Sequence, residues 1–79
     1  MGVDNTEERL ELRLGQFLKL ADLVGSGGEG KILIQDGLVT VNDEVETRRG
    51  RHLQLDDVVT CRGRKVKVAQ VLREREERH

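Results

Sequence analysis

The spacing of the apolar residues changes from helical to strand-like at Gly37, and no other feature constrains the fold as strongly. Before this glycine, Phe17, Leu20, Ala21 and Val24 fall at positions i, i+3, i+4 and i+7, which form one stripe of a helix. After it, apolar residues alternate with polar ones, as in a strand with one buried face. A helical segment followed by a β-sheet is therefore expected.

Two helices are predicted before Gly37, and local signals mark their ends. The first covers about residues 15–24. The second begins after Ser26, whose hydroxyl can accept the backbone N–H of Glu29 in a capping box. It ends at Gly37, where the missing Cβ allows the left-handed C′ conformation. The two helices are expected to form a hairpin.

The remaining runs predict short strands around this hairpin. They lie at residues 10–14, 38–41, 45, 53–55, 58–62 and 65–71, with turns at 42–43 and around Gly63. The expected fold class is α+β, with the two-helix hairpin packed on a small twisted, mainly antiparallel β-sheet. The predicted domain covers residues 10–71, between a disordered or frayed acidic N-terminus (1–9) and a charged C-terminal tail (72–79).

Composition removes several function classes. A chain of 79 residues builds one compact domain, and 14 Lys and Arg against 15 Asp and Glu give a net charge of −1, so bulk charge predicts no partner. One Phe and no Trp or Tyr exclude the aromatic platforms that stack unpaired bases. A single cysteine, Cys61, fits a cytoplasmic protein without disulfides, and no apolar run is long enough for a membrane span.

The basic residues nevertheless gather in two segments. Residues 47–54 carry three arginines, and residues 61–69 carry four Lys and Arg, both without acids. In the first segment, the guanidiniums of Arg48, Arg49 and Arg51 present forks that match phosphate oxygens. The competing interpretation is a set of salt bridges to Asp43, Glu44 or Glu46. Both readings remain open from the sequence.

The glycine-rich stretch 25–31 resembles a phosphate-binding P-loop, but Ile32 replaces the hydroxyl residue that binds Mg²⁺, and a helix precedes the stretch instead of a strand. Its glycines either approach a phosphate or form a tight interhelical turn. Asp56-Asp57 reads as a turn, and neither Cys61 nor His52 has a catalytic companion. We therefore expect no enzyme activity and no cofactor.

Four motifs in order resemble the S4 domain, the αL RNA-binding module. They are Arg13-Leu-Gly-Gln-Phe-Leu-Lys-Leu-Ala, Ser26-Gly-Gly-x-Gly-Lys31, Gly37-x-Val39-x-Val41-Asn42 and Arg48-Arg-Gly-Arg51-x-Leu53-x-x-x-Asp57. The similarity covers about residues 10–68, and small bacterial proteins that consist of little else are the nearest match.

This resemblance implies a binder of structured RNA, with ribosomal RNA as the commonest target. We therefore expect a noncatalytic, cytoplasmic, monomeric module that binds ribosomal RNA or a ribosomal particle, with no membrane or small-molecule partner. The contact residues that the resemblance implies are Gln16, Lys19, Ser26, Gly27, Gly28, Lys31, Arg48, Arg49 and Arg51. The alternative function is a protein-interaction adaptor whose arginines dock an acidic partner.

Overall fold

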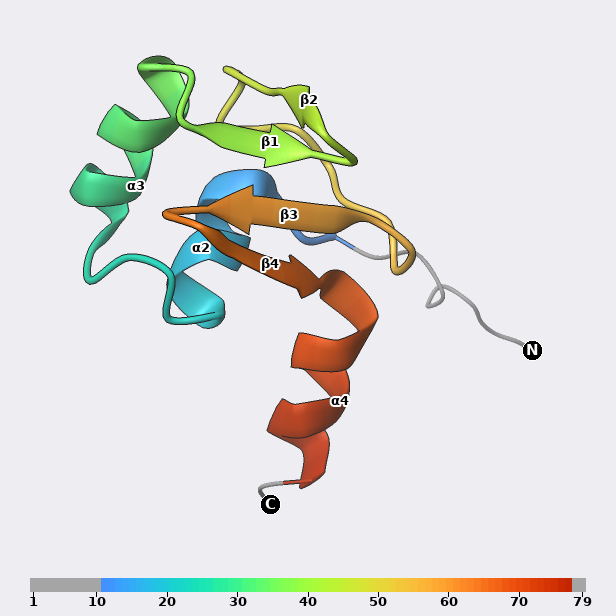
Figure 1. Cartoon of the computed structure of the whole chain (residues 1–79). Coiled ribbons are helices and arrows are strands. Elements are labelled where there is room, and N and C mark those ends of the chain that lie inside the picture. Colours follow the sequence, from blue (N-terminus) through green and yellow to red (C-terminus); the bar gives the residue numbers. More distant parts are fainter. Residues whose placement is uncertain (1–10, 78–79) are drawn as a thin grey trace.

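The computed structural model describes residues 11–77, which form an α+β fold of three helices and one four-stranded antiparallel sheet (Figure 1). The elements in chain order are α2 (Leu14–Leu20), α3 (Gly27–Gln35), β1 (Val39–Val41), β2 (Glu44–Val45), β3 (Val58–Cys61), β4 (Arg64–Lys67) and α4 (Val68–Glu77). The predicted fold class is confirmed.

Two tight turns set the register of the sheet, whose strand order is β2-β1-β3-β4. Val41 pairs with Glu44 across Asn42 and Asp43, which have φ values of 55° and 69°. The β3–β4 turn has the same geometry, with φ of 57° and 77° at its two central residues. Positive φ at both central residues is the signature of a type I′ hairpin, which matches the twist of the flanking strands.

The core lies between α2 and the inner face of the sheet. Alternate residues of β1 and β3 point toward this helix, which lies behind the sheet in the view of Figure 1. The largest fully buried side chains are Phe17, Leu14, Leu18, Ile34, Leu53, Val39, Val41, Val59, Val68 and Cys61. The helical and β segments therefore share one core.

Helix α3 begins and ends at the predicted signals. The Ser26 hydroxyl accepts the Glu29 N–H at 3.2 Å, and the Glu29 carboxylate accepts the Gly25 N–H at 2.8 Å. At the other end, Gly37 has φ of 77°, and its N–H and that of Leu38 donate to carbonyls of the last helical turn. This is a Schellman motif, in which the glycine occupies the left-handed C′ position.

Two predicted strands are wrong. Within the described part of 10–14, Arg13 makes one isolated bridge with His52, and Leu14 already belongs to α2. Residues 53–55 form a loop, although Leu53 is fully buried as an alternating pattern would require. Among the described residues, the two segments pair with each other only at this bridge and at the bond from the Leu53 N–H to the Leu12 carbonyl at 2.9 Å, which is too short a ladder to form strands. The predicted N-terminal segment, 1–9, lies outside the described residues.

The first helix is shorter than predicted, because it ends at Leu20 instead of Val24. Asp22 adopts φ of 62°, which breaks the helix and redirects the chain. Val24, the last residue of the predicted helical stripe, is buried after this change of direction, so that spacing was produced by two different backbone conformations.

The largest correction concerns the C-terminal end, where the strand predicted for 65–71 stops at Lys67 and α4 begins at Val68. The first two N–H groups of α4 donate to carbonyls of the preceding loop, Val68 to Asp57 at 3.0 Å and Ala69 to Leu55 at 3.1 Å. Val71 then packs into the core one turn later. Residues 72–77, expected as a charged tail, continue this helix.

Candidate nucleic-acid interface

The arginine run forms a loop that closes the N-terminal end of α2. The Leu14 N–H donates to the Arg51 carbonyl at 2.8 Å, and the Gly15 N–H donates to the Arg49 carbonyl at 3.0 Å. These amides belong to the first turn of the helix, where no intrahelical acceptor exists. The pairing therefore satisfies two N–H donors of the first helical turn and fixes the loop against α2.

Gly15 permits this close approach. A Cβ at this position would lie 2.5 Å from Cγ of Arg49 and 3.1 Å from its Cδ, too close for unshifted atoms. The aliphatic part of the Arg49 side chain therefore crosses directly over Gly15, and a larger residue would displace it.

A depression of about 520 Å³ lies at this junction of helix and loop. Three of its described lining residues are basic, and none is acidic. The lining consists of Arg13, Gly15, Gln16, Lys19, Gly27, Arg49 and Gly50. Within the described lining the net charge is therefore positive, which is the sign that attracts an anion.

The structure brings four of the nine predicted contact residues to this depression: Gln16, Lys19, Gly27 and Arg49. Ser26 is occupied as the N-cap of α3, while Gly28 and Lys31 are exposed on that helix and do not line the depression. The sequence-based prediction omitted Arg13, Gly15 and Gly50. Arg13 and Gly15 belong to the same motif as Gln16 and Lys19, but their approach to the loop 48–51 is a tertiary contact that spacing does not reveal.

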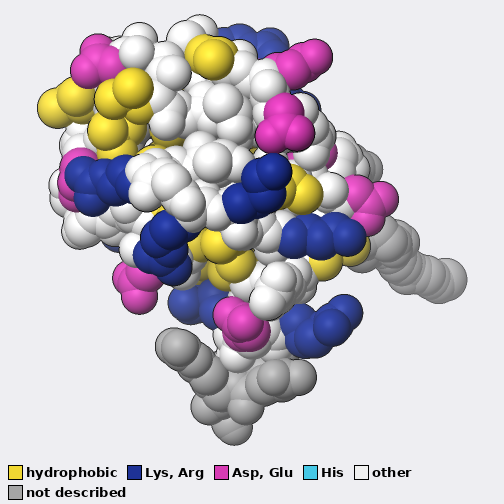
Figure 2. Space-filling view, viewed as in Figure 1, with side chains coloured by type: hydrophobic (Ala, Val, Ile, Leu, Met, Phe, Trp, Pro, Cys, Tyr) yellow, Lys and Arg dark blue, Asp and Glu magenta, His cyan; other side chains and the backbone are white. Residues whose placement is uncertain are grey.

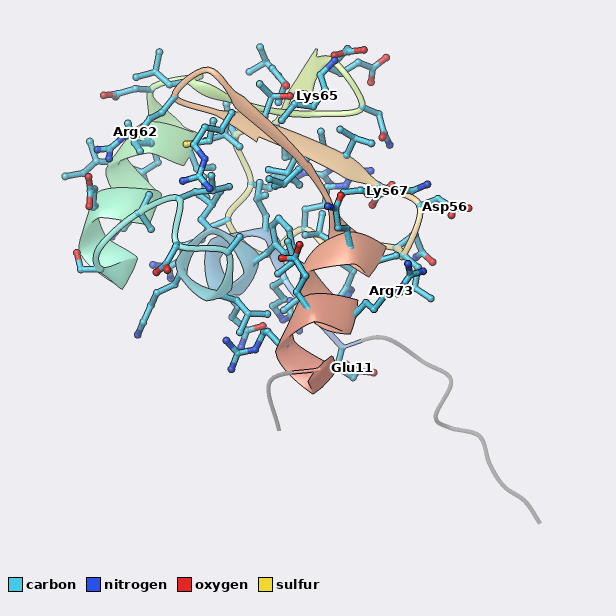
Figure 3. The ribbon with its side chains drawn as sticks, turned by 60° about the horizontal axis from the view of Figure 1, so that its bottom comes forward. Glu11, Asp56, Arg62, Lys65, Lys67 and Arg73 are labelled. Atoms are coloured by element: carbon cyan, nitrogen blue, oxygen red, sulfur yellow. The ribbon has the colours of Figure 1, made fainter. Side chains whose placement is uncertain are left out.

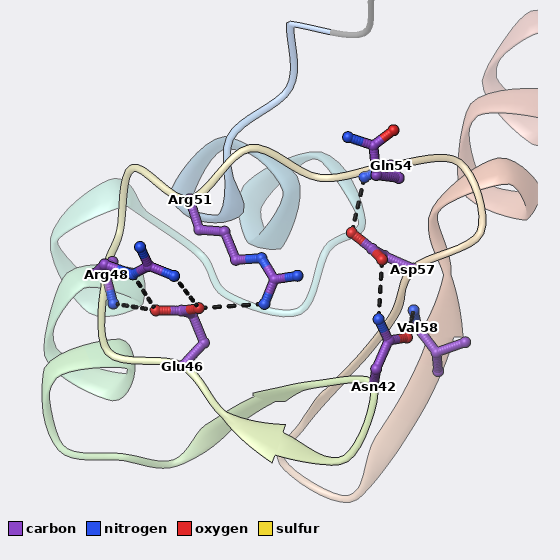
Figure 4. A network of polar contacts seen from close by, with 7 residues as sticks. All are labelled: Asn42, Glu46, Arg48, Arg51, Gln54, Asp57 and Val58. Carbon is purple, nitrogen blue, oxygen red and sulfur yellow. Dashed lines mark hydrogen bonds and ion pairs between the residues drawn. The ribbon is translucent and has the colours of Figure 1, made fainter.

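Arg48 and Arg51 both form salt bridges with Glu46 (Figure 4). Arg48 donates to the carboxylate from its backbone N–H at 2.9 Å, from Nε at 2.9 Å and from Nη2 at 3.1 Å. Arg51 adds a bond from Nη1 at 3.2 Å. The salt-bridge interpretation is therefore correct for two of the three arginines, with Glu46 as the acceptor.

This pairing has a measurable electrostatic signature. The Arg48 side chain, then its backbone N–H, lower the pKa of Glu46 from 4.5 to about 2, against the opposing effect of burial and with a smaller contribution from Arg51. The Glu46 side chain is only 8% exposed, whereas that of Arg48 is 76% exposed. The pair therefore shapes the loop from within and leaves the Arg48 guanidinium largely in solvent.

The Asp57 carboxylate holds the loop 54–57 in shape through hydrogen bonds (Figure 4). This buried carboxylate accepts the Gln54 N–H at 2.8 Å and the Asn42 side-chain amide at 2.9 Å. Asn42 in turn accepts the Val58 N–H at 3.0 Å. Two motif residues that are far apart in sequence thus tie the β1–β2 turn to the start of β3.

No catalytic centre is evident in the part of the chain that the structure describes. Residues 11–77 contain no cluster of His, Cys, Asp and Glu able to hold a metal ion. Cys61 is fully buried, and burial raises the pKa of its thiol, which keeps it protonated. Among the described helices, none has the length and apolar character to cross a membrane.

The second basic segment lies on the β3–β4 hairpin. Figure 2 shows Lys and Arg side chains spread across the face that these strands present, and Figure 3 labels Arg62, Lys65 and Lys67 there. Arg62 forms an ion pair with Glu29 at the start of α3, and Lys65 lies 3.6 Å from Asp43. Lys67 has no ion-pair partner among the described residues. This segment is therefore partly neutralised.

The described residues form a small α+β fold with a basic depression at the junction of α2 and the loop 48–51. The family model for the S4 domain matches residues 7–69, so the chain belongs to the S4 domain family, whose members are RNA-binding modules. Over 52 residues it is 52% identical to a Bacillus subtilis (strain 168) protein named probable ribosome maturation protein RlbA. That alignment covers 66% of this chain and 73% of the relative.

Proposed function

We propose that this protein is a noncatalytic RNA-binding module that recognises structured RNA, with ribosomal RNA or a ribosomal particle as its partner. The observation that carries the proposal is the basic depression, whose described lining includes three cations and no carboxylate. Membership in the S4 domain family and the ribosome-maturation name of the Bacillus relative support the same reading.

In this proposal, the guanidinium of Arg49 and the ammonium of Lys19 bind backbone phosphates from two sides of the depression. Arg13 is held near them by its Nη1, which donates to the Gly50 carbonyl at 3.1 Å. Gln16 and the exposed backbone of Gly27 offer uncharged contacts to the same strand. The other predicted contact residues do not line the depression, and in this proposal they add weaker contacts to the same RNA: Ser26, Gly28, Lys31, Arg48 and Arg51.

Glu46 changes the expected roles of the arginines. One carboxylate between two guanidiniums leaves a single net positive charge there, so Arg48 and Arg51 mainly hold the loop in shape. The exposed side of Arg48 remains able to meet a phosphate. Arg49, which has no ion-pair partner among the described residues, is therefore expected to contribute most to affinity.

Recognition by this surface rests on charge and shape, because the chain has no Trp or Tyr to stack unpaired bases. A stem-loop should therefore outcompete an unstructured strand of equal length. If about four phosphates are neutralised, log K should fall against log salt with a slope of roughly −3 to −4. We also propose that the protein is cytoplasmic and works as a monomer without a cofactor. Light scattering of the free and RNA-bound protein would test the monomeric state.

The decisive experiment is charge reversal at Arg49, measured by fluorescence anisotropy with a fluorescein-labelled RNA stem-loop. Arg49→Glu should abolish measurable binding while circular dichroism shows an unchanged fold, because the backbone carbonyl that accepts from Gly15 is retained. The matched control is Arg73→Glu, an exposed residue of α4 outside the depression. Equal binding by both variants would refute the proposed site.

The adaptor alternative predicts a different competition result. Acidic protein surfaces offer carboxylates to the same guanidiniums, so polyglutamate should displace an acidic partner at concentrations that leave an RNA complex intact. Tight, salt-dependent binding of polyglutamate with no binding of the RNA stem-loop would replace the proposed function with the adaptor.

A further inference from the structure

Lys19 borders more than one depression, and this links the candidate interface to the C-terminal helix. Besides the depression beside Arg49, it lines one of about 320 Å³ with Gln16, Leu20 and Arg75. It also lines a third, of about 220 Å³, that reaches Arg64. The hollowed surface therefore continues past Lys19 along α2 to α4 and β4.

The packing of α4 explains why Arg75 faces this surface. Val68 and Val71 are buried in the core, and Leu72 packs against it, so one face of the helix is held on the domain. Arg75 follows Val68 by seven residues and Val71 by four, which places it on that face. Arg73, labelled in Figure 3, extends from a different side of the same helix.

Arg64 reaches the same hollow from the sheet. It pairs with Cys61 across the β3–β4 ladder, so its side chain leaves the strand on the face that covers the core. Its Nη1 lies 3.4 Å from the Asp22 carbonyl, at the end of α2. Lys65 and Lys67 alternate with it and leave from the opposite face.

We infer that Arg64 and Arg75 form a second phosphate-binding site on the far side of Lys19, so that the bound RNA backbone runs along α2 from Arg49 to α4. The inference rests on the proposed function and extends it to a helix and a strand that the sequence motifs leave unassigned. Its partner is the phosphate backbone of the same RNA molecule.

The hollow beside Arg64 is also lined by carboxylates, which provide a further test of phosphate binding there. Asp22 and Glu74 line it together with Lys19, Arg64 and Arg75. A phosphate in this hollow meets a net positive charge but is repelled by Glu74, so removing that carboxylate should strengthen RNA binding. A purely structural role for these arginines predicts no such gain.

The test compares salt dependence in paired variants of the full chain, again with the fluorescein-labelled RNA stem-loop. The double variant Arg64→Gln and Arg75→Gln should weaken binding and make the slope of log K against log salt shallower by roughly 1.5 to 2, as expected for two lost phosphate contacts. The control variant Lys67→Gln and Arg73→Gln removes the same charge outside the hollow and should leave the slope unchanged. Glu74→Gln should tighten binding about twofold.

The outcomes separate this inference from the proposed function. Equal slopes for the two double variants, with Arg49→Glu still abolishing binding, would overturn the second site and leave the first intact. A parent protein that binds the stem-loop without salt dependence would overturn both. Equal weakening by the control variant would also overturn the second site, since net charge alone would then explain the effect.

Discussion

Glu46 offers the most quantitative test of how the arginine loop is held. Replacing it with glutamine keeps the size and one oxygen acceptor but removes the charge that binds Arg48 and Arg51. Folding lowers the pKa of Glu46 from 4.5 to about 2. The ionised carboxylate therefore stabilises the native protein fully at pH values above 4.5, the pKa of this group in the unfolded chain. This contribution should disappear as the pH falls from about 4.5 to about 2.

The magnitude follows from the same pKa. A lowering from 4.5 to about 2 corresponds to at most ~3–4 kcal/mol of folding free energy. The Arg48 side chain is 76% exposed, so solvent screening reduces the expected contribution to about 1–2 kcal/mol. Glu46→Gln should therefore lower the free energy of unfolding by about that amount near neutral pH, and by almost nothing near pH 2.

Urea denaturation of the parent and variant across this pH range measures the difference. Glu44→Gln is the matched control, because Glu44 is an exposed neighbour on β2 with no ion-pair partner among the described residues. The control should follow the parent at every pH. If the parent and Glu46→Gln lose stability in parallel as the pH falls, the carboxylate does not hold the loop and the electrostatic argument fails.

Glycines and the helix cap supply further predictions. Ser26→Ala should lower stability by about 0.5–2 kcal/mol in urea denaturation, through loss of the N-cap. Gly30→Ala should raise it by up to ~1 kcal/mol, since its Cβ would meet side chains no closer than 3.5 Å; a lower melting temperature would contradict this. Gly27→Ala has open space and should keep the fold but weaken RNA binding in anisotropy titrations. Gly15→Ala should displace the Arg49 side chain and reduce RNA affinity; an unchanged affinity would count against that contact.

The sequence by itself determined the elements whose signals are local. Ser26, Glu29 and Gly37 mark the ends of α3 because side-chain capping and a left-handed residue act within a few positions. The Asn42-Asp43 turn was equally predictable, since its positive φ values need residues that tolerate that conformation. The ordered motifs also identified the S4 family, which the family match to residues 7–69 confirms.

Misreadings arose where one pattern fits two structures. Val66 and Val68 alternate with lysines as in a strand, yet α4 begins at Val68 because carbonyls of the 54–57 loop accept its first N–H groups. Those acceptors lie more than ten positions away, so no local pattern shows them. Leu53 and Leu55 likewise alternate with a polar residue as in a strand, but among the described residues their segment is joined to its neighbour only by the isolated Arg13–His52 bridge and one further bond.

The candidate interface was decided by tertiary structure to a greater degree than the fold. The sequence shows three arginines but not which acidic residues they bind. Only the tertiary structure places Glu46 between Arg48 and Arg51 and packs the Arg49 side chain against Gly15. Composition fixes which charges a chain carries, but burial and distance fix which of them are neutralised. Here one buried carboxylate binds Arg48 and Arg51, whereas Arg49 has no ion-pair partner among the described residues.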